Sequence, residues 1–372
     1  MSGRVALLRR ELFAATLSGL AFGAGRDGGA PPIQFPHGRP LVSFALSPSG
    51  ELLATGASCS ELHADDALEG VTCWDLETLE PKWTTKLEGG VGLALQLQGG
   101  LRFSPDGRLI GANHHTNALA LLEASGGAIV RAWTDSNDSG PPPWCWSSDP
   151  AQPDTIAALA ERRLTLIPRK GPTRAVAVPA LRPVAFDALG LTLLGRDVLM
   201  RGAQRIALSV REGFGVSSAV SDTAIAVGTS GGELLVVDRA TFSVRHRLPL
   251  SCEAVSLSPR RDVVVAIRSD RRSAVLVRQG QPELVPGPLA PFEWLDLPDG
   301  RAVTTNVEGT RVATLTAAGE ILELGRRPRL LGVVPGASAL AWPRDETLVA
   351  IGPRVVARLD PATGAKRESR LR

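Results

Sequence analysis

The side chains best suited to metal binding or catalysis are few, and the first of them are two adjacent histidines. His114 and His115 end a predicted strand, where neighbouring side chains point to opposite faces. Two imidazoles placed in that way do not bind one metal ion, so we expect a polar histidine pair at the start of a loop. The sequence also lacks the HExxH, GxSxG and phosphate-loop motifs.

A second stretch resembles the opening of a calcium-binding loop. It contains Asp135 and Asp138 in the sequence Asp-Ser-Asn-Asp-Ser-Gly. A loop of this kind needs an acidic ligand at its twelfth position, and that position is Trp146. We therefore expect a polar surface loop and predict neither a metal ion nor another cofactor.

The cysteines give no metal or redox motif. None of Cys59, Cys73, Cys145 and Cys252 forms a CxxC pair, so we expect small buried hydrophobic residues. Cys59 and Cys73 flank a predicted hairpin and would be placed to form a disulfide if the protein is exported.

Composition argues against two classes of partner. The net charge is only +3, and arginines alternate with acidic residues along the chain, which does not favour nucleic-acid binding. No run of about 20 apolar residues is present after the first forty, so we expect no transmembrane span.

Residues 1–40 lack the strand rhythm of the rest and form a predicted N-terminal extension. Val5, Leu8 and Leu12 lie near helical spacing and would form an amphipathic helix. The alternative is an export signal of the twin-arginine type at Arg9-Arg10, followed by an Ala- and Gly-rich apolar run. The sequence favours the cytoplasm, and the periplasm follows if Arg9-Arg10 is such a signal.

The elements that must position these residues are short strands in a repeating unit. From residue 41 onward a four-strand unit recurs about every 40 residues, a period typical of propeller blades. The strands are short, β-branched and bounded by turn residues. Eight inner strands are predicted to begin near Leu41, Leu101, Trp144, Val184, Val216, Ala254, Phe292 and Ala339. A count of seven is the alternative, because the fourth unit is short.

Two turn signals recur in the units. The first is Ser47-Pro48-Ser49-Gly50, where proline presets φ and glycine supplies a positive φ, and it returns at Ser104 to Gly107 and at Leu297 to Gly300. The second is Asp-x-x-Thr between third and fourth strands, at Asp75, Asp238 and Asp360. A short acidic side chain there is expected to accept hydrogen bonds from the turn backbone.

These features resemble a known family. Trp74-Asp75 at the end of a third strand is similar to the Trp-Asp pair of WD40 repeats, and the SPDG turn is similar to turns of bacterial WD40-like repeats. Asp75, Thr78 and Trp83 are spaced as in quinoprotein-type propellers. The resemblance implies an all-β fold, a single closed β-propeller of four-stranded antiparallel blades over residues 41–372, in a divergent bacterial member.

The blade topology brings two long insertions to one face. They are Ser60–Gly70, between second and third strands, and Thr134–Pro143, between two blades. We predict that this face binds a partner protein, because exposed tryptophans beside adaptable loops are common recognition anchors. The alternative for both tryptophans is packing between blades. The predicted contact residues are His114, His115, Asp135, Asp138, Trp144 and Trp146.

The architecture favours a non-enzymatic protein-interaction scaffold, and the resemblance implies partner binding without naming the partner. The alternative is a small-molecule-binding or hydrolytic propeller with a site in its central channel. The predicted inner strands are largely apolar or small, with Asp187 and Asp296 as exceptions, and two carboxylates do not make a metal cage.

Overall fold

The computed structural model describes residues 42–57, 70–87, 100–114, 118–134, 143–160, 163–176, 181–209, 216–221, 223–229, 231–257, 264–268, 274–278, 281–284, 303–305, 311–315, 318–324, 329–337, 339–343, 347–352 and 355–370. Residues 1–41 lie outside this set, so the predicted extension and the Arg9-Arg10 signal stay predictions.

All strands in the described residues belong to eight four-stranded antiparallel sheets, each built from consecutive strands. Sheet 1 contains β1 (Val42–Leu46), β2 (Leu52–Ala57), β3 (Gly70–Asp75) and β4 (Pro81–Thr85). Sheet 2 contains β5 (Leu101–Phe103), β6 (Leu109–His114), β7 (Ala118–Glu123) and β8 (Ile129–Thr134). Sheet 3 contains β9 (Trp144–Trp146), β10 (Thr155–Ala160), β11 (Arg163–Pro168) and β12 (Arg174–Val176). Sheet 4 contains β13 (Arg182–Asp187), β14 (Gly190–Leu194), β15 (Val198–Arg201) and β16 (Gln204–Ala207).

The second half of the chain repeats the pattern. Sheet 5 contains β17 (Val216–Val220), β18 (Ala224–Thr229), β19 (Glu233–Asp238) and β20 (Val244–Leu248). Sheet 6 contains β21 (Cys252–Leu257), β22 (Val264–Arg268), β23 (Ala274–Arg278) and β24 (Gln281–Leu284). Sheet 7 contains β25 (Val303–Thr305), β26 (Val312–Leu315), β27 (Glu320–Leu324) and β28 (Arg329–Val333). Sheet 8 contains β29 (Ala339–Ala341), β30 (Leu348–Ile351), β31 (Val355–Leu359) and β32 (Lys366–Arg370).

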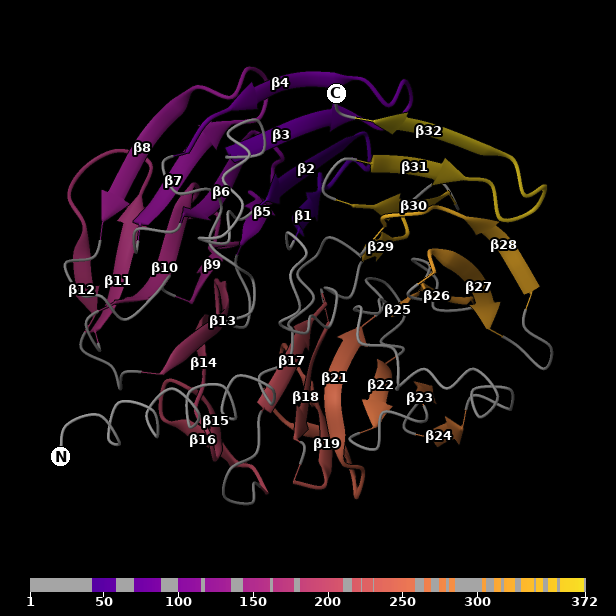
Figure 1. Ribbon diagram of the computed structural model, residues 1–372. Coiled ribbons are helices and arrows are strands. Elements are labelled where there is room, and N and C mark those ends of the chain that lie inside the picture. Colours follow the sequence, from indigo (N-terminus) through magenta and orange to yellow (C-terminus); the bar gives the residue numbers. More distant parts are fainter. Residues whose placement is uncertain are drawn as a thin grey trace, which may run out of the picture.

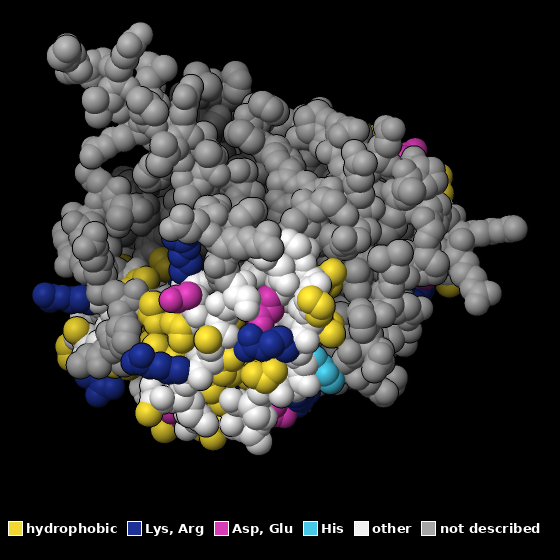
Figure 2. All heavy atoms as spheres, turned by 90° about the horizontal axis from the view of Figure 1, so that it is seen from below, with side chains coloured by type: hydrophobic (Ala, Val, Ile, Leu, Met, Phe, Trp, Pro, Cys, Tyr) yellow, Lys and Arg dark blue, Asp and Glu magenta, His cyan; other side chains and the backbone are white. Residues whose placement is uncertain are grey.

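The sheets stand around a common centre, with the first strand of each sheet innermost and the fourth outermost (Figure 1). This position explains the sequence pattern. Third strands such as β19 are buried along nearly their whole length, because a neighbouring sheet covers each face. Outer strands such as β20 alternate between exposed and half-buried residues. Figure 2 views the outer side of sheets 4 and 5, where apolar, basic and acidic side chains intermingle.

Hydrophobic clusters lie between neighbouring sheets and form the core. One cluster joins Ala54 and Val71 of sheet 1 to Ile110 of sheet 2, and others join sheets 2 to 3, 3 to 4, 4 to 5, 5 to 6 and 7 to 8. Sheets 6 and 7 meet through β21 and β25. Each sheet therefore buries its apolar faces on the sheets beside it.

The two ends of the described chain also meet. Leu53 and Trp74 of sheet 1 share a buried cluster with Val349 and Val356 of sheet 8. Arg367 Nη1 donates to the carbonyl oxygen of Glu77 at 3.1 Å. The fourth strand of the last sheet is β32, which the C-terminal segment supplies.

The proline–glycine turns have the predicted geometry. Gly50 and Gly107 adopt φ angles of 76° and 75°, which glycine reaches without a Cβ clash. The serine that opens each turn adds a bond that sequence alone did not indicate. The hydroxyl oxygen of Ser47 accepts from the backbone N–H of Leu52 at 3.0 Å, and that of Ser104 accepts from Leu109 at 2.9 Å.

The Asp-x-x-Thr turns are confirmed as well. The Oδ1 atom of Asp75 accepts from the N–H of Thr78 at 2.9 Å, and that of Asp238 accepts from Thr241 at 2.8 Å. Leu79 and Phe242, the residues that follow each threonine, adopt φ angles of 58° and 56°. The side chains of Leu79 and Phe242 are buried in the core. The aspartate carboxylate therefore stabilises a turn that contains a strained residue with a positive φ.

These turns should make the free energy of unfolding depend on pH. The backbone N–H of Thr241 and the guanidinium of Arg245 lower the pKa of Asp238 from 3.8 to about 2. A carboxyl with a depressed pKa in the folded state stabilises the protein well above 3.8, and this contribution disappears as the pH falls through about 2. We expect Asp238→Ala to cost about 1 kcal/mol at pH 7. Thermal unfolding from pH 7 to pH 3 should show this difference narrowing at the acid end, and a constant difference would contradict the assignment.

The predicted strand starts agree with the structure in seven units to within a few residues. The seventh unit differs, because its first described strand is β25, which begins at Val303 rather than near Phe292. Phe292 and the turn at Leu297 to Gly300, which placed the predicted strand, lie outside the described residues. The short fourth unit is a complete four-stranded sheet.

Candidate functional site

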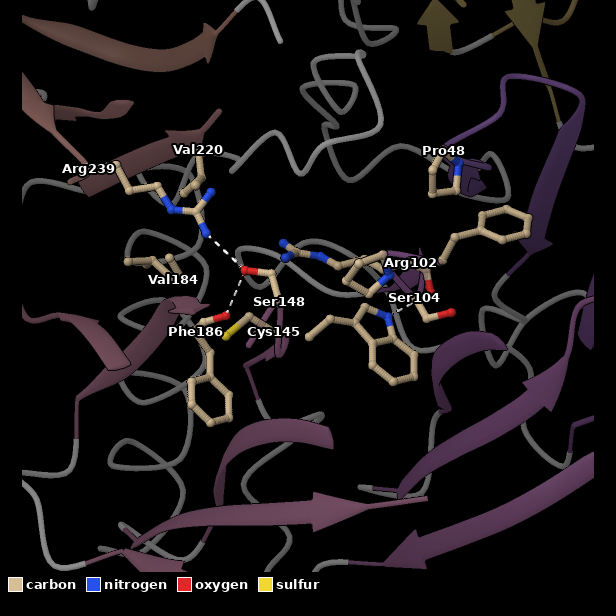
Figure 3. A pocket seen from close by; sticks show the side chains of 13 residues that line it. Pro48, Arg102, Ser104, Cys145, Ser148, Val184, Phe186, Val220 and Arg239 are labelled. Atoms are coloured by element: carbon tan, nitrogen blue, oxygen red, sulfur yellow. Dashed lines mark hydrogen bonds between the residues drawn. The ribbon is translucent and has the colours of Figure 1, made fainter. Parts of the chain in front are cut away.

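A pocket of about 80 Å³ lies near the centre of the ring, on the face that carries the β1–β2, β5–β6 and β19–β20 turns (Figure 3). We call this the turn face. Its walls come from the inner ends of sheets 1 to 5, and much of the wall is apolar. The described lining residues are Pro48, Arg102, Phe103, Ser104, Pro105, Cys145, Trp146, Ser148, Val184, Ala185, Phe186, Val220 and Arg239.

Two arginines bring positive charge into these apolar walls. Arg102 comes from β5, and Arg239 comes from the turn that follows β19. Figure 3 shows their guanidinium groups reaching in from opposite sides, with Ser148 between them. The described lining residues include no aspartate or glutamate.

Arg239 is held in place by a network behind the pocket wall. Its Nε donates to Asp187 Oδ2 at 2.9 Å, its Nη1 to the carbonyl oxygen of Ser221 at 2.8 Å, and its Nη2 to Ser148 Oγ at 3.2 Å. The side chain is only 10% exposed. Three sheets therefore fix the orientation of this guanidinium before any ligand arrives.

A second buried arginine shares the same carboxylate. Nη2 of Arg201 lies 3.8 Å from Asp187 Oδ2, its Nε donates to Thr192 Oγ1 at 2.9 Å, and its guanidinium stacks 5.0 Å from the ring centre of Phe242. Burial lowers the pKa of Arg201, against the opposing attraction of Asp187. One carboxylate thus balances two guanidinium groups in this cluster.

Ser148 ties the cluster to the backbone. Its N–H donates to the carbonyl oxygen of Phe186 at 2.7 Å, and its hydroxyl donates to the same oxygen at 3.1 Å. The hydroxyl oxygen in turn accepts from Arg239. These hydrogen bonds join the end of sheet 3 to the end of sheet 4 at the pocket.

A further positive charge lies deeper along the inner strands. Arg182 begins β13 and donates from Nη2 to Ser218 Oγ at 3.4 Å. Loss of solvent around the guanidinium, together with the nearby charge of Arg102, lowers the pKa of Arg182 to about 10. Arg182 therefore remains charged at neutral pH.

Cys145 lines the pocket but is not a nucleophile. Burial raises the pKa of its thiol to about 12, even though Arg102 and Arg239 act in the opposite direction. A thiol with this pKa stays protonated at neutral pH, so it contributes a small apolar surface.

The predicted tryptophan anchors are buried. Trp144 is 0% exposed and Trp146 is 8% exposed, and both pack in the cluster between sheets 2 and 3. Their rings meet edge to face with centres 5.9 Å apart, and Trp146 Nε1 donates to the carbonyl oxygen of Arg102 at 3.1 Å. The expectation of an exposed tryptophan pair is therefore wrong, and packing between blades is what occurs. Trp146 still reaches the pocket wall.

The other predicted contact residues are not brought to this pocket. His114 ends β6, at the end of the sheet opposite to the β5–β6 turn, and nothing is described of its side chain. His115, Asp135 and Asp138 lie outside the described residues. They stay candidates on the face opposite to the turn face, which we call the loop face.

Of the two cysteines in the predicted disulfide, Cys73 lies in the described residues. Cys73 is buried in β3, paired in register with Ala54 and Trp83, and burial raises its thiol pKa to about 12. Cys59 lies outside the described residues, so the disulfide stays a prediction.

Sequence reasoning missed the arginines that dominate the site. A signal was present for Arg102, which stands between two apolar residues of the inner strand β5, and for Arg182, which precedes an apolar run in β13. Arg201 and Arg239 carried no such signal, because their common partner Asp187 is distant in sequence from Arg239 and lies in another sheet.

The described part of the chain contains no group of three or more His, Cys, Asp or Glu side chains arranged to hold a metal ion. The same residues form no helix that is long and apolar enough to cross a membrane.

Comparison with protein-family models and with curated protein sequences gives no match. Comparison with solved structures gives many. Hsv2 of Kluyvelomyces marxianus is similar at 10% identity, with a TM-score of 0.50, over 90% of this chain and 100% of that one. The β-propeller domain of Cps50 (Swd1) from Myceliophteria thermophila has 15% identity and a TM-score of 0.46, over 88% and 96%. BamB of Moraxella catarrhalis has 15% identity and a TM-score of 0.42, over 91% and 93%.

Hsv2 of Kluyvelomyces marxianus is a β-propeller protein, so its likeness to this chain supports the predicted β-propeller repeat architecture. At such low identity the likeness concerns the fold alone.

Proposed function

We propose that the chain is a single closed propeller of eight blades that works as a non-enzymatic protein-interaction module. Eight blades rather than seven are favoured by the eight described sheets, and closure is favoured by the packing of sheet 8 on sheet 1. Residues 1–40 form an extension to it in this proposal.

The observation that carries the function is the pocket on the turn face. Five sheets converge there, and the hydrogen bonds of Arg239 and Ser148 fix its polar groups in advance. A rigid concave site at the centre of a broad face favours recognition, because little conformational entropy is lost on binding. We place the partner on this face.

The alternative function, a small-molecule-binding or hydrolytic propeller with a site in its central channel, receives less support from the contacts of Asp187. Asp187 was one of two carboxylates on which that alternative depended, and its Oδ2 atom is engaged by Arg239 and lies near Arg201. A carboxylate committed in this way is poorly suited to bind a metal ion or activate water. Asp296 lies outside the described residues.

The loop face remains a second candidate surface, and partner capture with variants of each face separates the two. Immobilised wild-type protein is compared with Arg102→Gln and with a variant in which residues 60–70 and 134–143 are replaced by Gly-Ser linkers. We expect Arg102→Gln to lose most of the captured partner and the linker variant to retain it. If only the linker variant loses the captured partner, the partner binds on the loop face. If the wild-type protein captures no specific partner, the proposal of an interaction module is contradicted.

A further inference from the structure

We propose that the turn-face pocket binds a proline residue, presented in an extended segment of the partner protein. The proline site rests on the function proposed above, because it names the chemistry by which the partner is recognised. The volume of the pocket, the rings in its walls and its hydrogen-bonding groups all favour this residue.

The volume of the pocket limits the group that it accepts. An apolar cavity of about 150 Å³ holds one benzene molecule. The turn-face pocket has a volume of about 80 Å³, so it is too small for the ring of a phenylalanine or tryptophan side chain. A proline ring or a branched aliphatic side chain has the matching size.

The walls of the pocket are rich in rings. Phe103, Trp146 and Phe186 are 4%, 8% and 5% exposed, so packing between the sheets fixes these rings. Pro48 is also held, because a Cβ atom added to Gly107 of the β5–β6 turn would lie only 3.4 Å from its Cδ atom. Figure 3 shows Pro48 and Phe186 on opposite sides of the pocket. Sites lined by aromatic rings are typical of proteins that bind proline-rich segments in the extended polyproline conformation.

The polar groups of the pocket favour a ligand that accepts hydrogen bonds and donates none. Arg239 donates from Nη1 to Ser221 and from Nη2 to Ser148. Each of these two nitrogen atoms carries a second hydrogen, for which the described residues provide no acceptor. In contrast, the hydroxyl groups of Ser104 and Ser148 each donate their one hydrogen, and each oxygen already accepts from an N–H group.

Proline matches this arrangement of donors and acceptors. Its nitrogen carries no hydrogen, so its burial leaves no backbone donor without a partner. The carbonyl group beside it accepts a hydrogen bond, which Arg239 donates from the pocket wall. The fixed φ of proline also reduces the conformational entropy that the segment loses on binding. A leucine in the same place brings a backbone N–H, whose loss of water the side chains of the pocket do not compensate.

The test is titration calorimetry of the full chain with three acetylated and amidated peptides. Their sequence is Ser-Ala-X-X-Ala-Ser, where both X residues are proline, leucine or glutamate. We expect the proline peptide to bind and the other two to bind at least about ten-fold more weakly. Equal or tighter binding of the leucine peptide would overturn the proposal, because the pocket would then accept any apolar side chain. Equal or tighter binding of the glutamate peptide would overturn it in favour of an acid-binding site.

Two variants of sheet 5 locate the binding. Val220 ends β17 and lines the pocket, so Val220→Phe fills the space for the ligand and should weaken binding of the proline peptide at least about ten-fold. Val244→Phe makes the same change on the outer strand β20, where the side chain is 41% exposed, and should leave the affinity unchanged. Equal affinities of the two variants would contradict a site in the pocket. If Val220→Phe does not fold, the three peptides on the wild-type protein decide.

The same measurements separate the proline site from the proposed function. If the protein captures a specific partner and the proline peptide neither binds nor competes with that partner, the interaction module stands and the proline site is overturned. If the proline peptide binds with the expected selectivity and no partner is captured, the proline site stands and the interaction module is contradicted.

Discussion

Replacing Asp187 by asparagine is expected to lower the free energy of unfolding by about 3 kcal/mol or more. The change keeps the shape of the side chain and removes the one described negative charge between Arg201 and Arg239, whose side chains are 5% and 10% exposed. The two buried guanidinium groups would then lose the carboxylate that they share, and Arg201 would keep only the smaller attraction of Asp238. Urea unfolding monitored by tryptophan fluorescence measures the loss.

Glu368→Gln is the matched control for this variant. Glu368 pairs with Lys366 and Arg370 on the exposed strand β32, where an ion pair contributes at most about 1 kcal/mol. If the Asp187 and Glu368 variants lose equal stability, the buried cluster does not order the pocket as described.

Replacing Trp144 by alanine should cost about 3 to 5 kcal/mol, because it empties a large space between sheets 2 and 3. The fit around this ring is close. A Cβ atom added to Gly111 of β6 would lie 2.4 Å from Cη2 of Trp144, so the neighbouring strand has glycine where the ring needs room. The guanidinium of Arg102 lies 5.8 Å from the ring centre, so the loss should also disturb the pocket.

Ile129→Ala provides the comparison for Trp144→Ala. Ile129 lies on the outer strand β8, is 49% exposed and should change stability by less than about 1 kcal/mol. A recognition anchor would behave differently, since its removal would weaken binding and spare stability. Near-normal thermal unfolding of Trp144→Ala would therefore contradict the burial of this residue.

The sequence allowed prediction of features that depend on neighbouring residues. Pro48 and Gly50 define a turn by their own backbone preferences. Asp238 stabilises its turn by accepting a hydrogen bond from the backbone N–H of Thr241, three residues further along the chain. For the same reason the strand starts were predicted well, except in the seventh unit, where the turn that guided the prediction lies outside the described residues.

Features that depend on contacts between sheets were beyond this reasoning. Trp144 stands at the start of a strand beside a long polar loop, and its position alone does not distinguish an exposed anchor from a core residue. The ring of Trp144 packs against Gly111 of sheet 2, where a side chain would occupy the space of the ring. Likewise, Asp187 was recognised as an unusual carboxylate on an inner strand, but its pairing with Arg239 of sheet 5 required the ring arrangement.

Site-specific photo-crosslinking in cells of the source tests most directly whether the partner binds on the turn face. A benzophenone amino acid is placed at Leu189, which is exposed in the β13–β14 turn on the turn face, or at Ile129, which is exposed on the outer side of sheet 2. The account predicts a discrete protein adduct from position 189 that Arg102→Gln diminishes, and none of comparable yield from position 129. An adduct of equal yield from both positions, or one from position 189 that Arg102→Gln leaves unchanged, would contradict it.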